Sequence, residues 1–148
     1  MRRLLPLALL LLVATPALAS AQVVLTLDEP LAAWTGRTFG AAAWPHAERC
    51  PALVCDRFEF LVALPDDLEW PAPPLAASIA WDSPEDDFDL YLYDGWGFLV
   101  TQSVGRLSQA ESVYVDEIKP GTYTLVVVPT LVVASGYDGR VELVVATS

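Results

Sequence analysis

Short apolar runs with the alternation of β-strands, each closed by turn-forming residues, follow one another along most of the chain. In residues 57–64, Phe58, Phe60, Val62 and Leu64 fall on one face, because successive side chains of a strand point to opposite sides. Runs of this kind, rich in β-branched and aromatic residues, predict strands. Strands are expected at residues 23–27, 57–64, 75–81, 87–93, 98–103, 112–118, 122–128 and 141–146.

Turn chemistry separates these runs and leaves little room for a helix. Residues 94–97 are typical of a hairpin connection, and residues 119–121 of a tight turn. The one helix candidate, residues 39–47, is interrupted at Pro45, whose ring prevents a helix from continuing. Seven to nine short strands without helices predict a single all-β domain, an antiparallel β-sandwich.

Residues 1–19 have the composition of a secretory signal peptide. Arg2 and Arg3 give a positive start, an aliphatic run follows, and residues 17–19 (ALA) match the small-residue pattern before a cleavage site. The folded domain is then expected to be residues 20–148, in a secreted or periplasmic protein.

Two positions are candidates for the signal-peptide cleavage site. We expect cleavage after Ala19, and a cut after Ala21 satisfies the same small-residue rule. A retained membrane anchor is disfavoured because the aliphatic run, residues 4–13, is shorter than the roughly 20 residues that cross a bilayer core.

The domain left after processing is strongly acidic. The chain has 19 acidic and 8 basic residues, a formal charge of −11, and the loss of Arg2 and Arg3 takes that charge to −13. Such a charge repels phosphate backbones and anionic lipid, so neither nucleic acid nor a membrane surface is an expected partner. Solubility and cation binding are the roles that remain for the charge.

Cys50 and Cys55 are the only cysteines in the chain. In the oxidising compartment that an exported chain enters, such a pair normally closes. We expect a local disulfide, worth on the order of 2 kcal/mol, that pins a loop against the strand beginning near Asp56. A redox dithiol or a metal site is not supported, because the spacing is not Cys-x-x-Cys and no His or Cys partners accompany the pair.

An acidic segment leads into the strand at residues 87–93. Phe88, Leu90 and Leu92 fall on one face of that strand, which predicts that this face is buried. The residues on the opposite face are Asp87, Asp89, Tyr91 and Tyr93.

Calcium is the cation that this segment suits, because it takes six to eight oxygen ligands. The candidate calcium ligands are Asp82, Glu85, Asp87, Asp89 and Asp94, with Asp86 in the same segment. The spacing is not that of an EF-hand, since no loop that begins with an aspartate of this segment has glycine at its sixth position, and no glutamate closes a twelve-residue loop. The alternative is a solvated acidic loop, in which Asp82 or Asp89 accepts hydrogen bonds from nearby backbone N–H groups.

The residue inventory does not favour catalysis. A hydrolytic triad needs a base that titrates near the working pH, and the one histidine, His46, lies in an Ala- and Pro-rich stretch. Glycoside hydrolysis needs one buried and one solvated carboxyl group, whereas a loop of consecutive acids is expected to be uniformly solvated. We therefore predict no enzymatic activity.

Five tryptophans are many for a domain of this size. Trp81 shares a face with Ile79 and is expected in the core. Trp96, between two glycines, and Trp70, beside prolines, are expected at the surface, where sugar rings or apolar groups can stack on an indole. Tyr91 and Tyr93 join this candidate ligand surface if their face of the strand is open. The alternative is that these rings cover the edges of the sheet.

An ordered set of motifs resembles the bacterial pre-peptidase C-terminal domain from about residue 56 onward. The motifs are residues 86–94 (DDFDLYLYD), 97–100 (GFLV) with Ser103, 111–115 (ESVYV), 120–127 (PGTYTLVV) and Tyr137-x-Gly139-x-Val141-x-Leu143. The resemblance implies a jelly-roll-like antiparallel sandwich, related in shape to P-type and collagen-binding domains, without catalytic residues of its own. It also permits calcium at one end of the sandwich.

Together these features predict an exported, non-catalytic β-sandwich that binds or scaffolds extracellular molecules, with calcium as a possible stabiliser. The alternative is a carbohydrate-binding module that uses the surface tryptophans and tyrosines. The expected partner is an extracellular protein or a polysaccharide.

Overall fold

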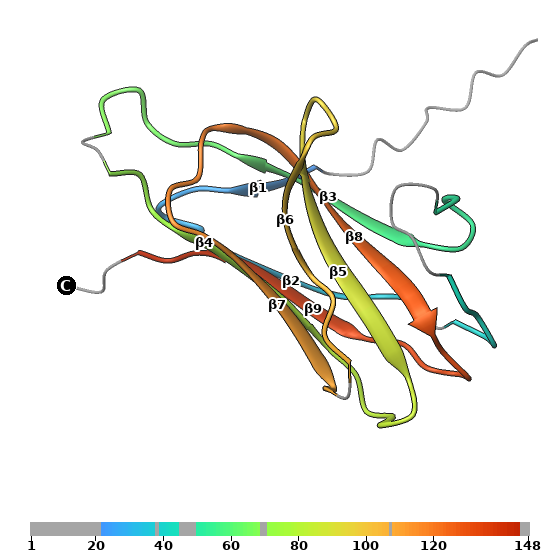
Figure 1. Ribbon diagram of the computed structural model, residues 1–148. Helices are drawn as coiled ribbons and strands as arrows, with labels where there is room; N and C mark the ends of the chain where they lie inside the picture. Colours follow the sequence, from blue (N-terminus) through green and yellow to red (C-terminus); the bar gives the residue numbers. More distant parts are fainter. Residues whose placement is uncertain (1–21, 38, 45–49, 69–70, 107, 146–148) are drawn as a thin grey trace, which may run out of the picture.

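The computed structural model describes residues 22–37, 39–44, 50–68, 71–106 and 108–145. These residues form nine strands in two layers, which confirms the predicted all-β sandwich (Figure 1). The strands are β1 (Val23–Leu25), β2 (Leu31–Thr35), β3 (Asp56–Val62), β4 (Leu75–Ala80), β5 (Asp87–Asp94), β6 (Leu99–Ser103), β7 (Ala110–Val115), β8 (Gly121–Leu131) and β9 (Asp138–Leu143). No helix in these ranges meets the length and apolarity needed to cross a membrane.

The strands pair as a set of nested hairpins. One sheet has the order β1-β3-β8-β5-β6 and the other β2-β9-β4-β7. β5 pairs with β6, β4 with β7, β3 with β8 and β2 with β9, all antiparallel, so the chain is one long hairpin rolled into two layers. This is the jelly-roll arrangement. β1 adds one parallel strand beside β3.

Apolar rows from both sheets meet between the layers. Phe88, Leu90 and Leu92 of β5 are fully buried in this core, as the two-residue period predicts. Trp81 is also buried there and contacts the Phe88 ring edge-on, with ring centroids 5.2 Å apart. The core therefore follows the faces that the sequence indicates.

A second apolar cluster covers part of the outer face of the larger sheet. Cys50 and Cys55 form the predicted disulfide, with their Cα atoms 5.7 Å apart. The loop that it closes packs with Tyr91 of β5 and with Val126 and Val128 of β8. One outer face of the sandwich is therefore partly buried beneath a local loop.

Several strand bounds differ from the expected ones, and two of the differences follow directly from strand pairing. β2 (Leu31–Thr35) was not expected, and it forms because its residues pair with β9 along their whole length. β9 begins at Asp138, three residues before the expected run, because Asp138 and Gly139 pair with both β2 and β4. In both cases tertiary pairing outweighs local propensity.

The start of the helix candidate at residues 39–47 is extended. Phe39 bridges to Ser135 and Ala42 to Val132, and both bridges are antiparallel. Residues 45–49, including His46, and residues 1–21, including the predicted signal peptide, lie outside the described residues.

Candidate functional site

The hairpin between β5 and β6 presents an aromatic ring at one end of the sandwich. The Asp94 carboxylate Oδ1 accepts hydrogen bonds from the backbone N–H groups of Trp96 at 3.0 Å and of Phe98 at 2.9 Å. Gly97 adopts a φ of 85°, a conformation that glycine adopts without strain. The turn is thereby fixed, and the Trp96 side chain is 86% exposed.

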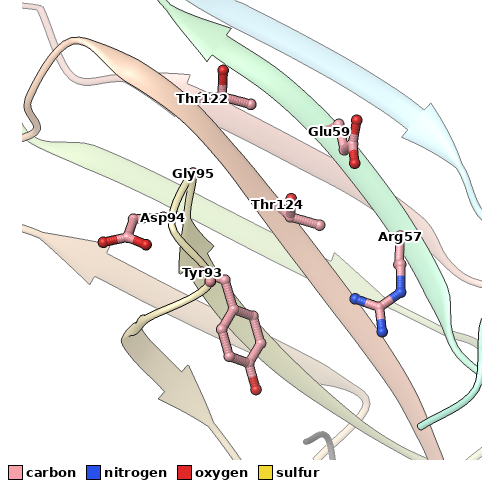
Figure 2. Close-up of a pocket in the computed structure, with 8 residues that line it drawn as sticks. Arg57, Glu59, Tyr93, Asp94, Gly95, Thr122 and Thr124 are labelled. Carbon is pink, nitrogen blue, oxygen red and sulfur yellow. The ribbon is translucent and has the colours of Figure 1, made fainter.

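A polar hollow of about 440 Å³ lies on the outer face of the larger sheet, beside this hairpin. Figure 2 shows its side chains projecting from β3, β8 and β5. Glu59, Thr124 and Tyr93 form a single row across the three strands, because Thr124 is in register with both of the other residues. The lining residues are Arg57, Glu59, Tyr93, Asp94, Gly95, Gly97, Thr122 and Thr124.

A second hollow of about 550 Å³ lies between the β5–β6 hairpin and the turn from β7 to β8. The Tyr123 hydroxyl donates a hydrogen bond of 2.9 Å to the Lys119 carbonyl, which holds this turn against the start of β8. Its lining residues are Asp94, Gly95, Trp96, Val100, Val115, Glu117, Ile118, Lys119, Pro120, Gly121, Thr122 and Tyr123.

The two hollows share Asp94, Gly95 and Thr122, so they adjoin at the base of the hairpin. We call the two hollows together the hairpin groove. It combines an exposed indole, hydroxyl groups and charged side chains of both signs. Such a surface can stack against the flat face of a ligand and form hydrogen bonds with its polar edge.

The predicted ligand-binding aromatics do not all reach the groove. Trp96 is exposed, as predicted, and lines the second hollow, and the half-buried Tyr93 lines the polar hollow. Tyr91 is only 9% exposed, because the disulfide loop covers it, so the condition that this face of the strand is open is not met at Tyr91. Trp70 lies outside the described residues.

The predicted calcium ligands are dispersed. Asp94 lies at the opposite end of β5 from Asp87, about 23 Å away at 3.3 Å per residue. Its carboxylate supports the β5–β6 turn. Asp82 and Glu85 are exposed in the connection from β4 to β5. The expectation of one site formed by all five residues is therefore wrong, because a strand separates its members.

Two of the remaining acids of the segment, Asp86 and Asp89, accept hydrogen bonds from the protein, whereas the buried Oδ1 of Asp87 and Oδ2 of Asp86 have no hydrogen-bond partner among the described residues. Asp86 is 4% exposed, and its Oδ1 accepts a 2.7 Å hydrogen bond from the Val133 N–H. The Tyr91 hydroxyl donates to Asp89 Oδ2 at 3.3 Å. Within the described ranges, no group of three or more His, Cys, Asp or Glu side chains is arranged to hold a metal ion.

A buried glutamate near the start of β5 was not foreseen. Glu111 of β7 is buried, and its carboxylate accepts hydrogen bonds from the hydroxyls of Ser103 and, at 3.2 Å, of Ser108. The alternation of the strand could have indicated its burial, because Glu111 lies two residues before the buried Val113 and therefore on the same face of β7.

This charge affects two carboxyl groups of β5. Burial, followed by the Glu111 charge, raises the pKa of Asp87. Burial also raises the pKa of Asp89, with further increases from the charges of Asp87 and Glu111. Both pKa values are raised because desolvation and nearby negative charge disfavour the ionised form of a carboxyl group.

The groove also contains residues that sequence reasoning missed, namely Arg57, Glu59, Thr122, Thr124, Glu117 and Lys119. Alternation along β8 places Thr122 and Thr124 on the side opposite Leu125 and the core. Only the register of β3, β8 and β5 shows that they adjoin Tyr93.

No protein-family model matches the chain, and no curated protein matches it.

Proposed function

We propose that this protein is an exported, non-catalytic β-sandwich module that binds other extracellular molecules through the hairpin groove. The observation that carries the proposal is the exposed Trp96, held on a fixed turn between two hollows. Tryptophan is enriched among the side chains that contribute most of the binding energy at interaction sites. A fixed turn also lowers the entropy that binding must overcome.

Export is supported by the signal-peptide composition of residues 1–19 and by the disulfide. We further propose kinship with the pre-peptidase C-terminal domain, on the ordered motifs in residues 86–143 and on the jelly-roll strand order. The proposed mature protein is residues 20–148.

The groove is better suited to binding than to catalysis. Asp94 Oδ1 accepts two backbone hydrogen bonds, and Glu59 is exposed on β3. Neither side chain has the apolar surroundings that turn a carboxyl group into a general acid. We therefore assign both carboxylates to hydrogen bonding and to charge.

Carbohydrate is the second candidate function, as the ligand of the same groove. The observation that favours it is the composition of the polar hollow, where each side chain is charged or bears a hydroxyl group. The donors and acceptors of such a lining can form hydrogen bonds with the hydroxyl groups of a sugar.

A binding screen of the mature protein tests the leading proposal. The panel is an array of polysaccharides together with immobilised collagen, fibronectin and laminin. For whichever member binds, Trp96→Ala should weaken the affinity at least tenfold, because stacked tryptophans act as binding hot spots. The melting temperature should stay the same, because Trp96 is exposed.

The control for this screen is Phe98→Ala on the same hairpin. Phe98 is 70% exposed and does not line either hollow. Its removal should leave the affinity within about twofold, as is usual for surface positions outside a binding site. Equal binding by Trp96→Ala and the unmodified protein would overturn the proposed site.

A further inference from the structure

We infer that the hairpin groove accepts an uncharged polysaccharide chain across at least two sugar rings, one stacked on Trp96 and one over Tyr93. This inference rests on the proposed function and specifies the ligand class of the same site. Four features support it, namely the shape of the groove, the two linings and the balance of charge.

The shape favours an extended ligand. The polar hollow lies over β3, β8 and β5, and the second hollow lies beyond the hairpin. Gly95 lines both hollows and leaves their junction without a side chain, whereas a Cβ atom at this position would lie 3.2 Å from the Thr122 carbonyl oxygen. A chain of linked rings can therefore pass from one hollow to the other.

The lining of the polar hollow favours hydroxyl groups over apolar side chains. Thr122, Thr124 and Tyr93 provide hydroxyls, and Glu59 and Arg57 provide an acceptor and a donor. Apart from the Tyr93 ring, an apolar side chain of a peptide would meet only glycines and polar side chains there. A sugar ring edged with hydroxyls can exchange its water for these partners.

The second hollow provides the apolar part of the site. Trp96 lies beside Val100, Val115 and Ile118, which gives this hollow an aliphatic wall. The face of an indole carries partial negative charge and attracts the polarised C–H groups on the flat side of a pyranose ring. A ligand with flat apolar faces and polar edges suits both hollows at once.

The charges of the groove select against anionic ligands. Its carboxylates are Glu59, Asp94 and Glu117, and its cations are Arg57 and Lys119. The Arg57 guanidinium also donates to the Cys50 carbonyl at 3.3 Å, which directs this cation toward the disulfide loop. The full chain carries a formal charge of −11, and its proposed mature form, without Arg2 and Arg3, carries −13. A uronate or sulfated chain would therefore be repelled.

Calorimetry with defined hexasaccharides tests the inference. The probes are cellohexaose, laminarihexaose, mannohexaose and N-acetylchitohexaose, with hexagalacturonate as the anionic counterpart. We expect at least one uncharged probe to bind and hexagalacturonate not to bind. Trp96→Ala should weaken binding more than tenfold. Thr124→Val, which removes one hydroxyl at constant shape, should weaken it about threefold to tenfold.

The outcomes separate this inference from the proposed function. If no uncharged probe binds, while a matrix protein is captured in a Trp96-dependent manner, the ligand class is wrong and the binding module stands. Hexagalacturonate binding as tightly as the best uncharged probe would also overturn the inference. If neither sugar nor protein binding depends on Trp96, both proposals are wrong. Phe98→Ala should leave the affinity for the sugar unchanged, because it lies outside the groove.

Discussion

Residues of one type perform different tasks along β5 and the loop before it. Asp86 accepts a hydrogen bond from the Val133 backbone, which joins two loops at one end of the sandwich. Asp94, at the other end, organises the turn that carries Trp96. Asp89 lies between them, buried beside Tyr91. The environment of each carboxylate, rather than its place in an acidic segment, sets its role.

Asp89 provides a prediction at this scale. Its pKa is raised in the folded protein, first by burial, so the native state binds this proton more tightly than the unfolded chain does. The stabilising contribution of Asp89 is therefore fully present below pH 3.8, the ordinary pKa of this carboxyl group. It is lost as the pH rises through the raised pKa of the folded protein. Asp89→Asn removes this pH dependence. The free energy of unfolding of the variant, relative to that of the unmodified protein, should therefore increase as the pH rises.

Urea unfolding between pH 3 and pH 8 measures this difference. Asp82→Asn, an exposed position in the preceding loop, is the matched control and should change the free energy of unfolding little at any pH. A constant difference between Asp89→Asn and the unmodified protein across the range would contradict the assignment.

Among the elements, the disulfide loop has a packing role beyond closing a short ring. It covers Tyr91, Val126 and Val128, which would otherwise form an apolar strip on the outer face of the sheet. Arg37 binds the loop from outside, donating to the carbonyls of Leu53 at 2.8 Å and Cys55 at 3.2 Å. The loop therefore separates a buried part of this face from the open part at the groove.

Removal of the disulfide should lower stability. The double substitution Cys50→Ala, Cys55→Ala should lower the free energy of unfolding by about 2 kcal/mol, because the unfolded chain gains conformational freedom. Urea denaturation measures it. Leu53→Ala within the same loop is the control, since this side chain is 89% exposed and should contribute little. An unchanged midpoint in the double variant would show that the loop stays closed without the bond.

At the scale of the whole molecule, the acidic residues are spread over the sandwich. β5 separates Asp94 from the connection between β4 and β5, and Asp86 and Asp89 have protein partners. The charge therefore acts on the molecule as a field that repels anions.

This distribution predicts the response to calcium. The mature protein should melt at the same temperature in chelator and in millimolar calcium, within about 1 °C, because a ligand stabilises only a state that it binds. Differential scanning calorimetry provides the measurement. A rise of several degrees that disappears in the double variant Asp87→Asn, Asp89→Asn would show that these carboxylates do bind the ion.

The sequence by itself determined which residues face the core and where the chain turns. The alternation in residues 87–93 predicted the buried row of Phe88, Leu90 and Leu92. Cysteine spacing predicted the disulfide, and Trp81 lies in the core with Ile79 as expected. Each of these inferences is local, because a two-residue period or a short loop is fixed by neighbours along the chain.

Only the tertiary structure decided which residues share a site. Pairing between distant strands places Glu59, Thr124 and Tyr93 in one row, and it separates Asp94 from Asp87 by the length of β5. It also covers Tyr91 while leaving Trp96 exposed. Alternation tells which face a side chain occupies, whereas its neighbours depend on strand order and register. Those are set by the joint packing of two sheets.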